Sequence, residues 1–366
     1  LYMCQHLQNA FLDKNDLFKM IITQGCLFTQ LVFQEEMARE CVPNSDTDSA
    51  IYYTQALVEW RRGKLDFSKP SYEMNAFITL VLSHGIKHYL ALACRGMGVE
   101  SDDVFLISMK NEFLYDLIFS SALAKHYIAI ATIQEGKVLP SYRVDLKGVG
   151  FRNSAYPEYI KTTFMSYVLE LFDLIRKEVQ IKNHLVMDPV VNAEYHIYQR
   201  LMQGDISYLS NTTVKPAEEY DIPEQSAYLY YELWTEVFSS VYGEMTVPSK
   251  CLKIPLYGGD RFLKNTKILN KLKQLDAGIH DRLLKFCKER GRDKLAYILI
   301  PPSFDEIPKL FLEIMDMRQS ITSICVPFYR FLELLGVATA KVDENELVSD
   351  FYSVKEQLVP FGIVEN

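Results

Sequence analysis

The chain has 366 residues, which is enough for two or three domains with a large buried core. Hydrophobic residues make up 49% of it and charged residues 23%, a composition typical of globular proteins and unlike that of disordered ones. The formal net charge of −8 excludes a uniformly basic coat for nucleic acid, but it allows a local basic groove. Seven cysteines without a CxxC pair or a metal-ligand spacing favour a reducing compartment.

We expect no membrane segment. The most apolar stretch, residues 77–94, is interrupted by His84, Lys87 and His88, and no signal peptide opens the chain. The two histidines have the spacing of a helical zinc site, but without a third ligand they indicate a surface helix pair. The chain begins with Leu1 and not with Met, which leads us to expect that it is part of a longer gene product.

The first half of the chain alternates helical and strand patterns. Apolar spacing predicts helices over the first forty residues, followed by a turn-rich stretch at 41–49 and a short strand at 51–54. A long helix is predicted at 74–97. Further strands are predicted at residues 104–109, 113–119 and 127–134, the last of them closed by a Glu135-Gly136 turn.

The second half is richer in helix. Pro157 suits the first turn of an amphipathic helix that extends to about residue 182. The remainder alternates helices with short strands such as 297–300. The change from strand-rich to helix-rich sequence falls near residues 140–156, where we place a domain boundary. The predicted fold class is therefore α+β, followed by a mostly helical region.

The sharpest chemical feature is the tetrapeptide DTDS at residues 46–49. Asp46 and Asp48 are two positions apart beside a strand, so their carboxylates project close together to one side. Such a pair repels itself unless cations lie between the oxygens, and Mg²⁺ suits carboxylates that are completed by water and phosphates. Two such ions can support an in-line phosphoryl displacement. An ordinary Asx turn explains the tetrapeptide alone equally well.

Charged and aromatic residues farther along could extend this site. Glu112 precedes a strand and could add a third carboxylate, while Lys125 and Tyr127 lie at the start of the next predicted strand. Lys147 is followed by glycines, and Arg152 comes shortly afterwards. Cations beside glycines, where backbone must approach another group closely, suit a phosphate track. Each of these residues by itself is more typical of a solvated surface or a turn.

The order of these motifs resembles that of the family B DNA polymerases, especially those of tailed bacteriophages. Members have a YGDTDS-like hairpin, a strand with a Glu, a KKRY-like strand and a KGxE-like segment. The corresponding residues here are NSDTDS at 44–49, Glu112, AKHY at 124–127 and KGVG at 147–150. Order and spacing match over about residues 1 to 180. The resemblance implies a template-directed DNA polymerase that transfers a nucleotidyl group from a dNTP to a primer 3′-hydroxyl with two Mg²⁺ ions.

The resemblance also implies a domain plan and a role for each residue. Residues 1–40 would be the end of the fingers and a palm helix, 41–150 a palm with an antiparallel sheet and the catalytic hairpin, and 151–366 a mostly helical thumb. Asp46 and Asp48 would hold the metal ions, supported by Glu112. The implied contacts to primer–template DNA are Lys125, Tyr127, Lys147 and Arg152.

Parts of a complete family B polymerase have no counterpart in this sequence. The motif that supplies the other catalytic Asp is absent, as are the exonuclease motifs, which predicts a second polypeptide or an N-terminal portion that carries both. Asn44-Ser45 replaces the usual Tyr-Gly, and Gln5 replaces the fingers lysine. These departures leave open a catalytically inactive, polymerase-like DNA-binding subunit of a replication complex. A remoter alternative is an unrelated metal-dependent phosphohydrolase.

Residues 261–294 form the most basic segment. It contains eleven Lys and Arg and four Asp and Glu, which gives a net charge of +7. In a thumb this segment would bind DNA phosphates, with Lys264, Lys267 and Lys271 as candidates, whereas elsewhere it would be a solvated helix face. The acidic stretch 343–346 with Phe351-Tyr352 is a candidate peptide for a sliding clamp, because family members often end that way. The expected location is intracellular, in the host cytoplasm or a viral replication compartment.

Overall fold

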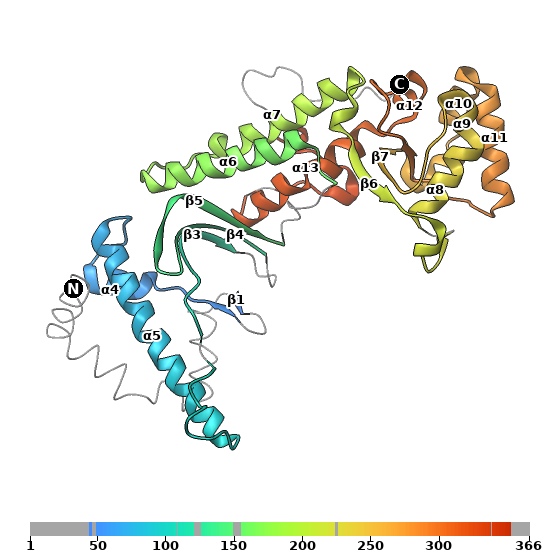
Figure 1. Ribbon diagram of the computed structural model, residues 1–366. Helices are drawn as coiled ribbons and strands as arrows, with labels where there is room; N and C mark the ends of the chain where they lie inside the picture. Colours follow the sequence, from blue (N-terminus) through green and yellow to red (C-terminus); the bar gives the residue numbers. More distant parts are fainter. Residues whose placement is uncertain are drawn as a thin grey trace. The chain divides into compact units, whose positions relative to one another are not determined.

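The computed structural model divides the chain into two compact units, Leu1–Gly148 and Val149–Asn366 (Figure 1). The division falls inside the stretch 140–156, where the sequence changes from strand-rich to helix-rich. Helices and small antiparallel sheets together give the predicted α+β fold. The structure describes residues 44–45, 49–107, 109–120, 126–148, 155–223, 226–337 and 339–352, so the helices predicted over the first forty residues lie outside the described part.

A short hairpin flanks the DTDS motif. Strand β1 (Asn44–Ser45) pairs antiparallel with β2 (Ala50–Ile51). The strand predicted at 51–54 is therefore wrong beyond Ile51. Thr54 instead precedes helix α4 (Gln55–Arg62), and its hydroxyl donates a hydrogen bond to Asn75 Oδ1 at 2.6 Å. Because helix α4 begins at Gln55, the strand does not continue through residues 52–54.

Helix α5 (Lys69–Gly96) is the predicted long helix, and it begins five residues earlier than expected. Pro70 in its first turn is compatible with that start, because the first helical N–H groups have no partner within the helix. By length and composition α5 could also cross a membrane, and 17% of its most apolar window is buried. A single helix of this kind is a weak indication, since core helices share the property. Tyr72 of α5 donates to Asp116 of the neighbouring sheet at 2.6 Å.

The strand predicted at 104–109 is wrong, because residues 101–106 form turns and a bend. Val104 is buried with Ala91 and Cys94 of α5. The ring of Phe105 meets His88 edge-on, with 5.8 Å between ring centroids. Val104 and Phe105 thus contact the helix, whereas Leu106 and Ile107 are exposed.

The sheet of the first unit has the strand order β3-β4-β5, with antiparallel pairing throughout. Both predicted strands, 113–119 and 127–134, are confirmed. Positive φ angles at Glu135 (49°) and Gly136 (78°) make the predicted two-residue turn, in which Gly carries no steric cost. The third strand was not predicted, and it contains Pro140, which an edge strand tolerates. The strands are β3 (Phe113–Ser120), β4 (Tyr127–Gln134) and β5 (Lys137–Lys147).

Three helices pack together in the second unit: α6 (Glu158–Arg176), α7 (Asn183–Met202) and α13 (Met317–Leu334) (Figure 1). The predicted helix at 157–182 ends early, at Arg176. Glu178 adopts a left-handed φ of 56°, and the N–H of Val179 reaches back to the carbonyl of Leu174, which closes the helix in a Schellman motif. The residue usually found at the left-handed position is Gly, which is why the sequence concealed this end.

A second antiparallel sheet, with the order β6-β7-β8, contacts α13, the helix at Ala227–Leu233 and the π-helical turn that follows it. Strand β8 agrees with the prediction at 297–300, and Ile298, Leu299 and Ile300 are buried. Trp234 and Phe311 stack in the core beside it. The elements are β6 (Ser210–Val214), β7 (Ser249–Pro255), β8 (Tyr297–Ile300), α8 (Ala227–Leu233), a π-helical turn (Trp234–Phe238), α9 (Ser239–Tyr242), α10 (Thr266–Leu275), α11 (Ala277–Glu289) and α12 (Lys309–Ile314).

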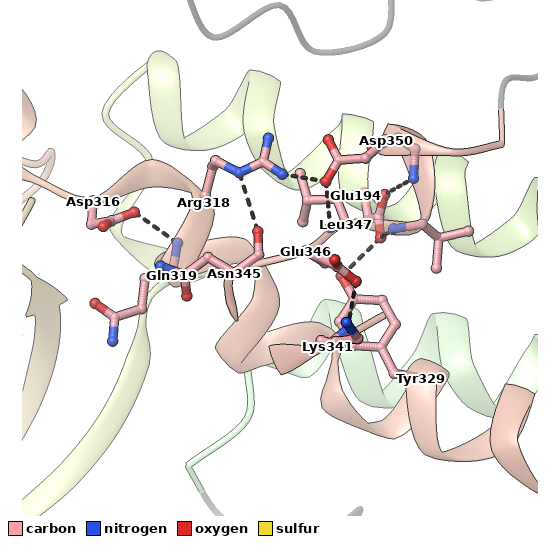
Figure 2. Close-up of polar contacts among 12 residues, drawn as sticks. Glu194, Asp316, Arg318, Gln319, Tyr329, Lys341, Asn345, Glu346, Leu347 and Asp350 are labelled. Carbon is pink, nitrogen blue, oxygen red and sulfur yellow. Dashed lines mark hydrogen bonds and ion pairs between the residues drawn. The ribbon is translucent and has the colours of Figure 1, made fainter. Parts of the chain in front are cut away.

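Residues 339–352, here named the C-terminal strap, lie on α7 and α13 (Figure 2). Glu194 of α7 is fully buried, and its carboxylate accepts hydrogen bonds from the Tyr329 hydroxyl at 2.8 Å and from the N–H groups of Val348 and Ser349 at 2.8 and 2.9 Å. Burial raises the pKa of Glu194, and these donors oppose that rise. The Tyr352 hydroxyl donates to Asp188 at 2.7 Å. The stretch considered as a clamp peptide is thus folded back onto the unit.

Candidate functional site

A row of paired residues crosses one end of the first sheet. Ser120 of β3 pairs with Tyr127 of β4, which in turn pairs with Lys147 of β5. Laterally paired residues project from the same face of a sheet, so these three side chains share one face. Tyr127 is buried and Lys147 is exposed. The predicted DNA contacts Tyr127 and Lys147 therefore lie next to each other.

The chain that follows the hairpin reaches this row. The hydroxyl of Tyr53, two residues after β2, lies 3.0 Å from the hydroxyl of Ser120, within hydrogen-bonding distance. Tyr53 is five residues from Asp48 in the sequence. The contact therefore brings the segment behind the DTDS motif to the end of the sheet where Tyr127 and Lys147 lie.

A cluster of two tyrosines and one carboxylate lies beside the row. The Tyr127 hydroxyl donates to Asp145 Oδ2 at 3.0 Å, and the Tyr115 hydroxyl donates to the same oxygen at 2.8 Å. The two rings are tilted, with 6.3 Å between centroids. Ala129 pairs with Asp145 and is fully buried, so a small side chain leaves room for both rings. We name Tyr115, Tyr127 and Asp145 the Tyr–Asp cluster.

Burial and charge keep both phenols of this cluster protonated. Burial, and then the negative charge of Asp145, raise the pKa of Tyr127 to about 12. Burial and the hydrogen bond to Asp145 raise the pKa of Tyr115 even further. Both hydroxyls therefore remain hydrogen-bond donors at neutral pH.

Glu112, the predicted palm glutamate, directly precedes β3 and is exposed. Its backbone carbonyl accepts the N–H of Glu135 at 2.8 Å. Its carboxylate charge makes a small contribution to the raised pKa of Tyr127, which places it within electrostatic reach of the cluster. Its role beside a metal ion stays a prediction.

Four of the predicted site residues lie outside the described part of the chain: Asp46, Asp48, Lys125 and Arg152. Within the described part, no group of three or more His, Cys, Asp or Glu side chains could hold a metal ion. His84 and His88 are exposed on α5, as expected for a surface pair. The donor set proposed for Mg²⁺ is therefore still the sequence pair Asp46 and Asp48, whose oxygen ligands suit a hard cation.

The basic segment of the second unit is partly neutralised by acids that the sequence count did not include. Lys271 of α10 pairs with Glu313 at 2.6 Å, and Lys294 pairs with Asp260 at 3.2 Å. Arg290 forms ion pairs with both Glu232 and Glu236. Lys264 and Lys267, two of the predicted DNA contacts, are exposed. The net charge of +7 therefore overstates the positive charge that this surface offers to DNA.

Sequence reasoning missed Asp145, Tyr115 and the contact between Tyr53 and Ser120. The stretch around Asp145 was interpreted as a glycine-bounded phosphate track and not as a strand. The alternation of Arg143, Asp145 and Lys147 with apolar residues was the available signal, since it puts all three on one face of a strand.

The sequence was compared with curated proteins and with protein-family models. No curated protein matches the sequence at a significant level. The family model described as Divergent Family B DNA polymerase matches residues 2–352, which is nearly the whole chain and includes every predicted and observed residue of the site. The chain therefore belongs to the divergent family B DNA polymerases.

Proposed function

We propose that this chain is the C-terminal palm and thumb portion of a template-directed DNA polymerase. Residues 41–150 would be the palm with the catalytic hairpin and residues 151–366 the thumb, preceded by the end of the fingers and a palm helix at 1–40. Family membership supports polymerase chemistry. The observation that carries the assignment of the site is the contact between Tyr53 and Ser120, which brings the segment behind the DTDS motif to the Tyr127–Lys147 row.

The site would divide its work between metal ligands and DNA contacts. Asp46 and Asp48 would hold the Mg²⁺ ions that family B polymerases generally use. The chemistry that Mg²⁺ held by these carboxylates would supply is activation of the primer hydroxyl and neutralisation of charge on the leaving pyrophosphate. Glu112 would add negative charge near the ligands. Lys125 and Tyr127 would hold the primer end, while Lys147 and Arg152 would neutralise primer-strand phosphates.

A complete active site would require more than this chain. A second polypeptide, or an N-terminal portion, would supply the other catalytic Asp and the exonuclease. The substrates would be primer–template DNA and a dNTP. A sliding clamp would be a further partner only if the C-terminal strap detached from α7. Tyr352, part of the candidate clamp peptide, donates a hydrogen bond to Asp188 of α7. The expected intracellular location agrees with four free, buried thiols in the described part, at Cys94, Cys251, Cys287 and Cys325.

The second candidate is a catalytically inactive, polymerase-like subunit that binds DNA or organises a replication complex. Asn44-Ser45 in place of Tyr-Gly favours it, as does Gln5 at the position of the fingers lysine. In the family that the sequence resembles, the fingers lysine neutralises the incoming triphosphate, a charge that Gln5 would not supply.

Asp48→Ala in the assembled polymerase distinguishes the two. The proposal predicts that primer extension falls by about 10³-fold while primer–template affinity is retained, because a carboxylate metal ligand acts mainly on the transition state. The matched control is Asp102→Ala, which removes an exposed carboxylate from a turn of the same unit and should change neither. Unchanged extension by Asp48→Ala would favour the inactive subunit. Robust extension by the isolated chain would refute the need for a partner.

A further inference from the structure

We infer that Asp145 is a positioning residue for Tyr127, which it fixes on the same sheet face as the exposed Lys147, its neighbour on β5, so that the two side chains bind the primer strand as a unit. This inference rests on the proposed function, in which Tyr127 and Lys147 contact the primer. Asp145 and Tyr127 are both nearly enclosed, with 6% and 7% of their surfaces exposed, so Asp145 acts through the orientation of Tyr127, and the exposed charge beside them is that of Lys147.

The geometry of the Tyr–Asp cluster supports this role. A tyrosine side chain can rotate about two bonds, and a hydrogen bond from its hydroxyl to a fixed acceptor selects one orientation. Asp145 Oδ2 provides that acceptor at 3.0 Å, and the same oxygen is held by Tyr115 at 2.8 Å. Three neighbouring strands, β3, β4 and β5, each contribute one member. The orientation of Tyr127 is therefore set by the sheet as a whole.

The position of Asp145 links Tyr127 to Lys147. Asp145 lies two residues before Lys147 on β5, on the same face, and diagonally across from Tyr127 on β4. With its hydrogen held by Asp145, the Tyr127 hydroxyl keeps one orientation on the face that carries Lys147. An exposed carboxylate here would repel phosphates, but burial and two phenol donors shield its charge from the surface.

A second carboxylate of the same sheet provides a matched control. Asp116 accepts hydrogen bonds from Tyr72 at 2.6 Å and from Thr132 at 2.5 Å. It lies at an irregularity of β3, between Tyr115 and Leu117, and these two bond partners belong to α5 and β4 and not to the Tyr–Asp cluster. Asp116 fastens α5 to the sheet with similar chemistry but does not contact Tyr127 through any of these bonds.

The test is a double-mutant cycle on the full chain with a fluorescent primer–template, measured by anisotropy. Asp145→Asn and Tyr127→Phe should each weaken binding about tenfold, the size of one charge-assisted hydrogen bond. The double variant should bind no more weakly than the weaker-binding single variant, because both changes remove the same hydrogen bond between Tyr127 and Asp145. Asp116→Asn should instead leave affinity within about twofold and combine multiplicatively with Tyr127→Phe.

A fluorine label separates positioning from mere stability. With 3-fluorotyrosine at position 127, the fluorine resonance of the wild-type chain should shift on addition of primer–template. In Asp145→Asn the resonance should broaden in the free protein, because the ring samples several orientations. If Asp145→Asn fails to fold, Asp145→Glu, which keeps the charge but moves the acceptor, should show the broadened resonance and weaker binding.

The possible failures are distinguishable. A resonance that does not move although the chain binds primer–template would remove Tyr127 from the primer site, and with it this part of the proposed function. A resonance that moves equally in wild type and in Asp145→Asn or Asp145→Glu, with unchanged affinity, would overturn only the role of Asp145. Multiplicative effects of Asp145→Asn and Tyr127→Phe would also overturn it.

Discussion

Two buried carboxylates, one in each unit, show how the same group can serve a site or a fold. Asp145 in the first unit is held by the hydroxyls of Tyr115 and Tyr127, next to the exposed Lys147. Glu194 in the second unit accepts one tyrosine hydroxyl and two backbone N–H groups of the C-terminal strap. Side-chain donors orient side chains, whereas backbone donors fix the path of the chain. We therefore assign positioning to Asp145 and fold stability to Glu194.

The largest effect should come from removing Glu194. Glu194→Ala leaves the Tyr329 hydroxyl and the N–H groups of Val348 and Ser349 buried without an acceptor, which should lower the free energy of unfolding by about 3–5 kcal/mol. Urea denaturation measures the loss, and limited proteolysis should then cleave within the strap. The control Glu333→Ala breaks an exposed pair with Arg330 and should change stability by less than about 1 kcal/mol.

Glu194→Ala also tests whether Asp145 and Glu194 have different roles. The folded fraction of Glu194→Ala should bind primer–template with the affinity of the wild type, whereas Asp145→Asn should not. A greater loss of DNA affinity from Glu194→Ala than from Asp145→Asn would reverse the two assignments.

An intermediate effect is expected from the lysines of the second unit. Replacing Lys264 and Lys267 together with Ala should reduce the slope of log affinity against log salt by about 2, since each phosphate contact contributes about 0.9. Lys271→Ala should change the slope less, because Glu313 already pairs with Lys271 at 2.6 Å. Lys341→Ala, an exposed lysine of the C-terminal strap outside the basic segment, is the matched control and should leave the slope unchanged. A slope that is the same in all of these variants would exclude this surface from DNA binding.

The smallest effect is an alkaline titration at Tyr127. Its raised pKa of about 12 means that, between pH 10 and 12, the folded chain keeps a proton that the unfolded chain loses. This contribution to stability is complete below about pH 10 and is lost as the pH rises through 12. Carbon-13 NMR of ring-labelled tyrosine, assigned with Tyr127→Phe, should find the midpoint near 12. Asp145→Asn should lower it, but not to 10, because burial is the larger cause. A midpoint unchanged by Asp145→Asn would contradict the contact.

The sequence predicted elements well where local pattern and tertiary packing agree. Strands β4 and β8 are continuous apolar runs bounded by turn residues, and both occur at the predicted positions. Residues 104–109 carry the same type of pattern, but the described residues among them pair with no strand in the described part of the chain. There Val104 and Phe105 pack onto α5 instead. Pairing partners are a property of the whole fold, which a local window does not contain.

The candidate site could be predicted only in part for a related reason. Motif order identified Tyr127 and Lys147, and the register of the sheet then placed them side by side. Asp145 has an ordinary local context, and it acquires its partners only when β3, β4 and β5 align. Likewise, the neutralisation of Lys271 and Lys294 depends on Glu313 and Asp260, which lie outside the basic segment.

Pro140 has a consequence for how the molecule behaves among copies of itself. It lies in β5, at the outer side of a three-stranded sheet whose adjoining residues are largely exposed. An unpaired edge strand can form backbone hydrogen bonds with a strand of another molecule and so start aggregation. Proline has no N–H group and therefore interrupts such pairing. Pro140 thus opposes self-association through the edge of the sheet that carries the Tyr–Asp cluster. Replacing Pro140 with a residue that has an N–H group should favour strand pairing between copies of the chain.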